Sequence, residues 1–204
     1  FSSLFTPVRI GNMTAGNRFC IQPMEGCDGT LDGAPDELTY RRYRRFGAGG
    51  AKVIWGEATA IDDAGRMNPR QLWLHDRSAS AIEQMLRDCR KSHAEVFGTT
   101  NDLIIGLQLT HSGRYGYRRP LIAMHDPLLD SLTIDKSTGR KLDDSYPLLT
   151  DDDLKRIEDQ FVAAARLAAK IGFDFVDIKQ CHRYLLSELL AATVRPGDYG
   201  GSIE

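Results

Sequence analysis

A cluster of proton-active side chains lies close to the end of the sequence, in the stretch DIKQCHRYLL at residues 177–186. The cluster comprises Lys179, Cys181, His182, Arg183 and Tyr184. It follows an apolar run that is typical of a buried strand. A lysine at the end of a barrel strand can form a Schiff base with a carbonyl substrate, but no other feature of the sequence supports an aldolase. Taken alone, Tyr184 is explained by packing at the start of a helix over 184–191.

Polar residues also follow three other expected strands. The apolar stretches that predict the four strands span residues 18–24, 51–61, 103–111 and 173–179. Their continuous apolar character is typical of parallel strands covered on both faces. The polar residues at their carboxyl ends are Gln22 and Glu25, Glu57, Gln108 and His111, and Lys179 and His182. Since the carboxyl ends of parallel strands meet at one edge of a sheet, we expect one site there. His111 is nevertheless better explained as a turn residue. Glu57 is explained equally well as half of a buried ion pair.

Helical patterns alternate with these strands. Apolar spacing predicts helices over 37–47, 78–97 and 151–171, the last with Thr150 as N-cap and Gly172 as C-cap. The strand–helix alternation predicts the α/β fold class with right-handed crossovers. A barrel and a doubly wound sheet both bind ligands at this edge, but no glycine-rich nucleotide-binding loop follows a strand.

Two segments lie outside this alternation, and we treat 1–204 as a single domain. Residues 8–18 predict a hairpin that turns at Gly11-Asn12. Residues 112–149 are too long for a simple connection, and their aromatic content favours an active-site loop that acts as a lid.

The composition excludes several classes of protein. The 204 residues carry a formal net charge of −2 and a pI of about 6.2, so we expect no nucleic-acid partner and no membrane surface as partner. No apolar run is long enough to span a membrane, and the first residues lack the pattern of a secretory signal. Four widely spaced cysteines predict neither a disulfide framework nor a zinc site. We therefore expect no metal and a cytoplasmic location.

Several segments together resemble a known family. They are LFTPVRIGNMTAGNRFCIQPM, EATA, LQLTHSGR, GFDFVDIKQCHRYLLSELL and RPGDYGGSIE. In this order they resemble the N-terminal half of the old yellow enzyme family of NADH:flavin oxidoreductases, which includes enoate reductases, 2,4-dienoyl-CoA reductase and trimethylamine dehydrogenase. The resemblance implies a (β/α)8 TIM barrel. Because such a barrel takes about 250 residues, we expect this chain to hold only about the first four βα units, a half barrel.

The resemblance also implies a reaction and a cofactor. Family members pass hydride from NADH or NADPH through FMN to an alkene conjugated with a carbonyl group, or to a related small-molecule substrate. The residues that match the family's flavin contacts are Gln22, Pro23, Met24, Glu25, Ala58 and Gln108. The Gln108 amide is implied to bind the pyrimidine edge of the flavin. The Met24 side chain is better explained by packing than by a cofactor contact.

Three residues match the family's catalytic positions. Tyr184 matches the position of the family's proton-donating tyrosine. A phenol with a pKa of about 10 carries its proton at neutral pH and can donate it to the substrate. Lys179 and His182 match two donors that hold the substrate carbonyl oxygen and stabilise the negative charge that develops on it. The crowding in the DIKQCHRYLL stretch is then an oxygen-binding clamp beside an acid.

Three residues depart from the family pattern. Lys179 replaces a neutral histidine, Glu25 replaces a thiol or hydroxyl near the flavin, and Arg183 replaces a glycine. An ionised Glu25 would repel a reduced flavin, and Arg183 would misplace Tyr184 if the glycine's backbone freedom is required. A half barrel also exposes strand edges and apolar surface, so we expect a homo-oligomer or a complementing second half barrel. The alternative function is a self-associating half-barrel protein with weak or no flavin binding.

Overall fold

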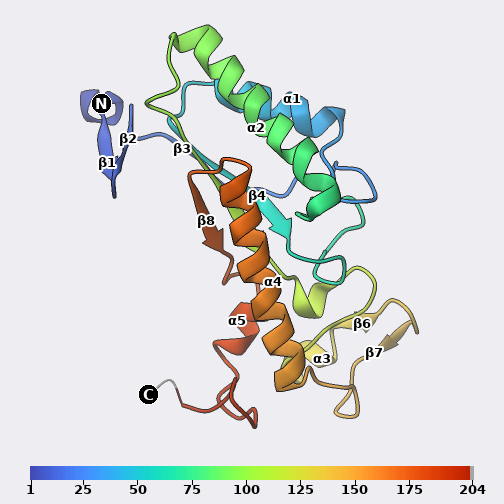
Figure 1. Cartoon of the computed structure of the whole chain (residues 1–204). Coiled ribbons are helices and arrows are strands. Elements are labelled where there is room, and N and C mark those ends of the chain that lie inside the picture. Colours follow the sequence, from blue (N-terminus) through green and yellow to red (C-terminus); the bar gives the residue numbers. More distant parts are fainter. Residues whose placement is uncertain (203–204) are drawn as a thin grey trace.

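A parallel sheet forms the centre of the chain in the computed structural model, which describes residues 1–202 (Figure 1). Its strands are β3 (Cys20–Ile21), β4 (Val53–Ala60), β5 (Ile104–Thr110) and β8 (Phe175–Ile178), in that order. Each neighbouring pair is parallel. These strands have the same order along the chain and across the sheet. Consecutive βα units of a barrel produce this arrangement.

A helix follows each of these strands along the chain. They are α1 (Glu37–Ala48), α2 (Asp76–Phe97), α4 (Asp151–Lys170) and the short α5 (Leu185–Leu189). The Thr150 hydroxyl accepts a hydrogen bond from the Asp153 N–H at 3.1 Å, so the predicted N-cap of α4 is confirmed. The predicted C-cap was one residue late: Ile171 is the cap, and Gly172 follows it with a φ of 100°. Glycine is favoured there because the residue after the cap adopts the left-handed conformation.

Shorter elements lie before and between these units. The 3-10 helix η1 (Ser2–Phe5) precedes an antiparallel hairpin of β1 (Val8–Ile10) and β2 (Met13–Ala15), which turns at Gly11-Asn12 with a Gly11 φ of 59°. Residues 112–149 contain η2 (Gly113–Tyr115), α3 (Pro127–Asp130), β6 (Ile134–Asp135) and β7 (Arg140–Lys141). No helix within residues 1–202 combines the length and the apolar character needed to cross a membrane.

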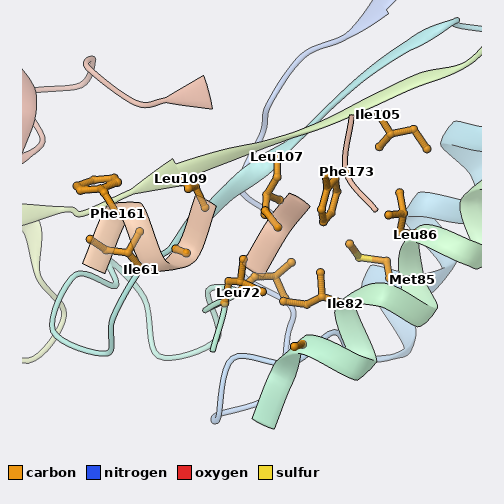
Figure 2. Packing of buried hydrophobic residues seen from close by; sticks show 14 of the residues in the cluster. Ile61, Leu72, Ile82, Met85, Leu86, Ile105, Leu107, Leu109, Phe161 and Phe173 are labelled. Carbon is orange, nitrogen blue, oxygen red and sulfur yellow. The ribbon is translucent and has the colours of Figure 1, made fainter. Parts of the chain in front are cut away.

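The main core lies between the outer face of the sheet and helices α2 and α4 (Figure 2). Leu107 and Leu109 of β5 meet Ile82 of α2 and Phe161 of α4 in this layer. Because side chains alternate across a strand, Gln108, which lies between these two leucines, faces the other way. It contributes to the inner face described next.

Candidate active site

The inner face of the sheet carries a polar group that joins three strands. The Asp177 carboxylate on β8 accepts hydrogen bonds from the Gln108 amide of β5 at 2.6 Å and from the Trp55 indole of β4 at 3.2 Å. The Trp55 ring also packs edge-on against Phe175, with 5.0 Å between centroids. Asp177 is not among the site residues predicted from the sequence. Its position two residues before Lys179, on the same face of a strand, was the available signal.

An ion pair lies at the carboxyl edge of this sheet. The Lys179 ammonium donates to the Glu25 carboxylate, with 2.7 Å between Nζ and Oε1. The Lys179 and Glu25 side chains are only 3% and 11% exposed. Two residues from distant parts of the sequence therefore form one neutral, nearly buried unit.

Tyr184 lies against both members of this ion pair. Its hydroxyl lies 3.5 Å from Glu25 Oε1, and the Lys179 ammonium lies 4.4 Å from the centre of its ring, within cation–π range. The hydroxyl also donates to the Met67 sulfur at 2.9 Å. Burial first, and then the negative charge of Glu25, raises the pKa of the Tyr184 phenol above its usual value. The phenol therefore carries its proton throughout the neutral range.

A strained turn brings Tyr184 back to this edge after β8. His182 and Arg183 have φ angles of 60° and 55°, in the left-handed region that non-glycine residues rarely adopt. Such residues cost about 1–3 kcal/mol each. The Tyr184 N–H closes the turn by donating to the Cys181 carbonyl at 3.2 Å. Position 183 therefore does adopt the backbone conformation that glycine favours. Arginine adopts this conformation here, and Tyr184 remains buried.

The segment that carries Glu25 is held by a second ion pair. Glu57, inside β4 (Val53–Ala60), accepts from the Gly26 N–H at 3.0 Å and pairs with Arg42 of α1 at 2.6 Å. Arg42 also pairs with Asp28, so the chain is tied on both sides of Cys27. Burial, with the nearby Glu25 charge, raises the Cys27 pKa to about 11. The ion-pair interpretation of Glu57 is confirmed.

Comparison with known proteins identifies the family. The sequence model of the NADH:flavin oxidoreductase / NADH oxidase family matches residues 3–204. The chain belongs to this family. The NADPH dehydrogenases of Listeria welshimeri and Clostridium acetobutylicum are 25% and 29% identical to it, and each alignment covers 98% of this chain and 55% of the relative.

Solved structures of old yellow enzymes confirm the fold. The old yellow enzyme of Pichia sp. AKU4542 superposes on 99% of this chain with a TM-score of 0.80 at 21% identity, and this covers 52% of its own chain. The old yellow enzyme homologue of Zymomonas mobilis gives a TM-score of 0.78 at 27% identity and is 56% covered. The chain thus spans about half the length of the relatives it matches, and the predicted half of a TIM-barrel fold is confirmed.

The other residues assigned by resemblance occupy different environments. Ala58 is fully buried, and its carbonyl accepts from Gln71 at 3.0 Å. Gln22 is exposed, and Pro23 is half-buried. The Met24 side chain is 76% exposed, so the packing interpretation of Met24 was wrong. Without a partner over it, this side chain contributes nothing to the core.

His182, the second predicted donor, lies at the rim of the site. The structure exposes it, with its ring centroid 6.0 Å from that of Tyr184. Its Nδ1 atom lies 3.8 Å from the exposed Cys181 thiol. The structure therefore brings Lys179 and Tyr184 together with Glu25, and leaves His182 beside them at the surface.

The start of the 112–149 segment packs against the candidate site. His111 is buried, and its Nδ1 accepts from the Gly113 N–H at 3.1 Å, as a turn residue should. Burial lowers the pKa of His111, against the opposing effect of Asp62. Tyr115 places its ring 5.9 Å from that of Tyr184. Through this ring, the segment packs against the candidate acid.

Proposed function

We propose that this chain forms the flavin- and substrate-facing half of an FMN-dependent oxidoreductase, which passes hydride from NADH or NADPH to an alkene conjugated with a carbonyl group. The observation that carries the proposal is the convergence of Tyr184, Lys179 and Glu25 at the carboxyl edge of the sheet. An acid and a cation side by side are the groups that this reduction requires. Family membership and the NADPH dehydrogenase relatives support the same reaction.

The inner face fits the ring of a flavin. Because Gln108 Nε2 donates to Asp177, the amide oxygen has no partner among residues 1–202 and can accept from the ring N–H of the pyrimidine edge. Gln22 and Met24, which follow β3, are exposed and available to contact a bound ring. The ion pair with Lys179 neutralises Glu25, which removes the charge repulsion expected against a reduced flavin. When bound, FMN supplies the two-electron chemistry.

The protein's own residues then act on the substrate. We infer that the Tyr184 hydroxyl gives its proton to the alkene carbon opposite the one that receives hydride. The tyrosinate that remains lies under the Lys179 ammonium, 4.4 Å from the ring centre, which offsets its charge. Lys179 has further N–H donors beyond the one on Glu25, and with His182 it can hold the substrate carbonyl oxygen.

An absorption spectrum and turnover assays test this function. We expect a visible flavin band after incubation with FMN, bleaching by NADH or NADPH, and recovery on addition of cyclohex-2-enone. Tyr184→Phe should bleach normally but lower the recovery rate by about 10²–10⁴-fold, the usual contribution of a general acid. Tyr199→Phe, which loses only an exposed bond to Glu158, should leave both steps unchanged. A flavin-loaded protein in which Tyr184→Phe reoxidises at the normal rate would remove Tyr184 from the mechanism.

A second function, a self-associating half barrel without catalysis, is favoured by one surface. β8 pairs only with β5 among residues 1–202. Beside it lies an apolar cavity of about 350 Å³. Its lining comes mainly from α4 and α5 and includes Phe161, Val162, Leu186 and Leu189. A colourless protein that takes up no FMN, yet has the solution mass of a stable oligomer, would support this function over the enzyme.

A further inference from the structure

Two of the three departures from the family pattern form a single interaction. Glu25 and Lys179 are 154 positions apart in the sequence, yet their charged atoms lie 2.7 Å apart. Removing a carboxylate and an ammonium from water is costly unless each has the other as partner. The two side chains are therefore expected to depend on each other, and changing one alone leaves a nearly buried charge without compensation.

Two other charged groups nearby have separate partners. The Glu57 carboxylate is held by Arg42, and Asp177 accepts from Gln108 and Trp55. Glu25, by contrast, contacts both Lys179 and the Tyr184 hydroxyl. It is thus the common partner of the two buried groups that face the substrate in the proposed function.

We propose that Glu25 is a positioning and selectivity residue: it holds the Lys179 ammonium and the Tyr184 hydroxyl in place and cancels the lysine charge, so that the site takes a neutral carbonyl oxygen in preference to an anionic oxygen such as a phenolate. The selectivity rests on the proposed function, whereas the positioning does not. Without Glu25, the same site would present an uncompensated cation beside a phenol. Such a site would attract anions, because Coulomb attraction is strong where water is excluded.

A tyrosine titration tests the positioning without any flavin. In Glu25→Gln the Tyr184 phenol loses an adjacent negative charge, so its pKa should fall by about one unit, a tenfold change in its ionisation constant. Absorbance of ionised tyrosine reports this, and Tyr184→Phe identifies which of the seven tyrosines has moved. Asp143→Asn, which removes an exposed carboxylate bonded to Ser145, should leave the titration unchanged. An unchanged titration in Glu25→Gln would overturn the positioning role.

Unfolding measurements test the dependence of the pair and guard against a variant that does not fold. Lys179→Met leaves Glu25 alone in a nearly buried position, whereas Glu25→Gln with Lys179→Met leaves no charge there. The double variant should therefore unfold at a higher urea concentration than Lys179→Met. Equal midpoints for these two variants would show that the carboxylate does not depend on the lysine and would refute the coupling.

Ligand binding tests the selectivity. The probes are 4-nitrophenolate, which is anionic, and cyclohex-2-enone, which is neutral, each titrated into FMN-loaded protein. Glu25→Gln should bind the phenolate roughly tenfold or more tightly than the unmodified protein, since it gains an uncompensated cation, and should bind the enone with little change. The gain should vanish when Lys179→Met is added. Equal changes for both ligands, or a gain that persists without the lysine, would overturn the selectivity.

The outcomes separate this inference from the proposed function. Failure to take up FMN, together with the expected tyrosine shift, would refute the function and the selectivity while establishing the positioning role. Normal FMN uptake and enone reduction, with an unchanged tyrosine titration and unchanged phenolate affinity in Glu25→Gln, would overturn the role of Glu25 and leave the function standing.

Discussion

A buried guanidinium ties the long 112–149 segment to the helix that follows Tyr184. Arg114 donates to Glu188 of α5 at 2.8 Å, to Asp130 of α3, and to the Met124 carbonyl at 3.0 Å. Its side chain is fully buried. The three contacts of this one side chain join parts of the chain that no strand connects. We therefore predict that Arg114→Met is among the most damaging single changes in this protein.

The magnitude follows from what Arg114→Met leaves behind. Glu188 would remain as a buried carboxylate without its cation, which typically costs about 3–5 kcal/mol, and Asp130 would keep only its contact with His125. This is a large part of the roughly 5–15 kcal/mol that stabilises a domain. Urea unfolding measures the loss. The matched control is Arg118→Met, which removes an exposed partner of Asp63 and should leave the urea midpoint nearly unchanged.

The pH dependence supplies a second check on Arg114→Met. Burial raises the pKa of Glu188 even with Arg114 present, and loss of the cation should raise it further. An acid whose folded pKa is raised above its unfolded value destabilises the fold once pH rises through the unfolded pKa, and the penalty is relieved as pH falls. The deficit should therefore be smaller at about pH 5 than at about pH 8. A deficit under about 1 kcal/mol, or one that grows on acidification, would refute the argument.

Three further changes test the fold. Gly106→Ala should destabilise the protein by about 1–3 kcal/mol, because a new methyl group would overlap the Phe175 ring, and adding Phe175→Leu should recover part of the loss in melting temperature. Thr150→Ala should cost about 1 kcal/mol in urea unfolding, since it removes the N-cap of α4. For Asp102, burial acts to raise the pKa, but hydrogen bonds from Lys52 and His93 lower it overall. Asp102 therefore stabilises the folded state above its ordinary pKa, and this stability is lost as pH falls through its lower pKa in the folded protein. In an acid unfolding curve, Asp102→Asn should lack this part of the loss of stability.

The regular elements of the main sheet and its helices could be predicted from sequence because their causes are local. The helix predicted over 151–171 is α4 (Asp151–Lys170), where apolar spacing, a threonine cap and a following glycine all agree. The hairpin turn at Gly11-Asn12 is local in the same sense. The first strand is shorter than predicted, with only Cys20–Ile21 in the ladder. Within residues 1–202 this strand pairs only with β4, and only these two residues join the ladder. The rest of the predicted stretch over 18–24 therefore lies outside the strand.

The sequence indicates where the candidate site lies, but only the tertiary structure shows which residues contact one another there. The sequence alone placed polar residues at the carboxyl ends of parallel strands, and this determined which edge of the sheet carries the chemistry. It did not indicate that Glu25 and Lys179 meet, or that Asp177 holds Gln108. These contacts depend on the register between β5 and β8 and on the path of the segment after β3. Periodicity records only which face a residue occupies, whereas packing in three dimensions decides which distant side chain it meets there.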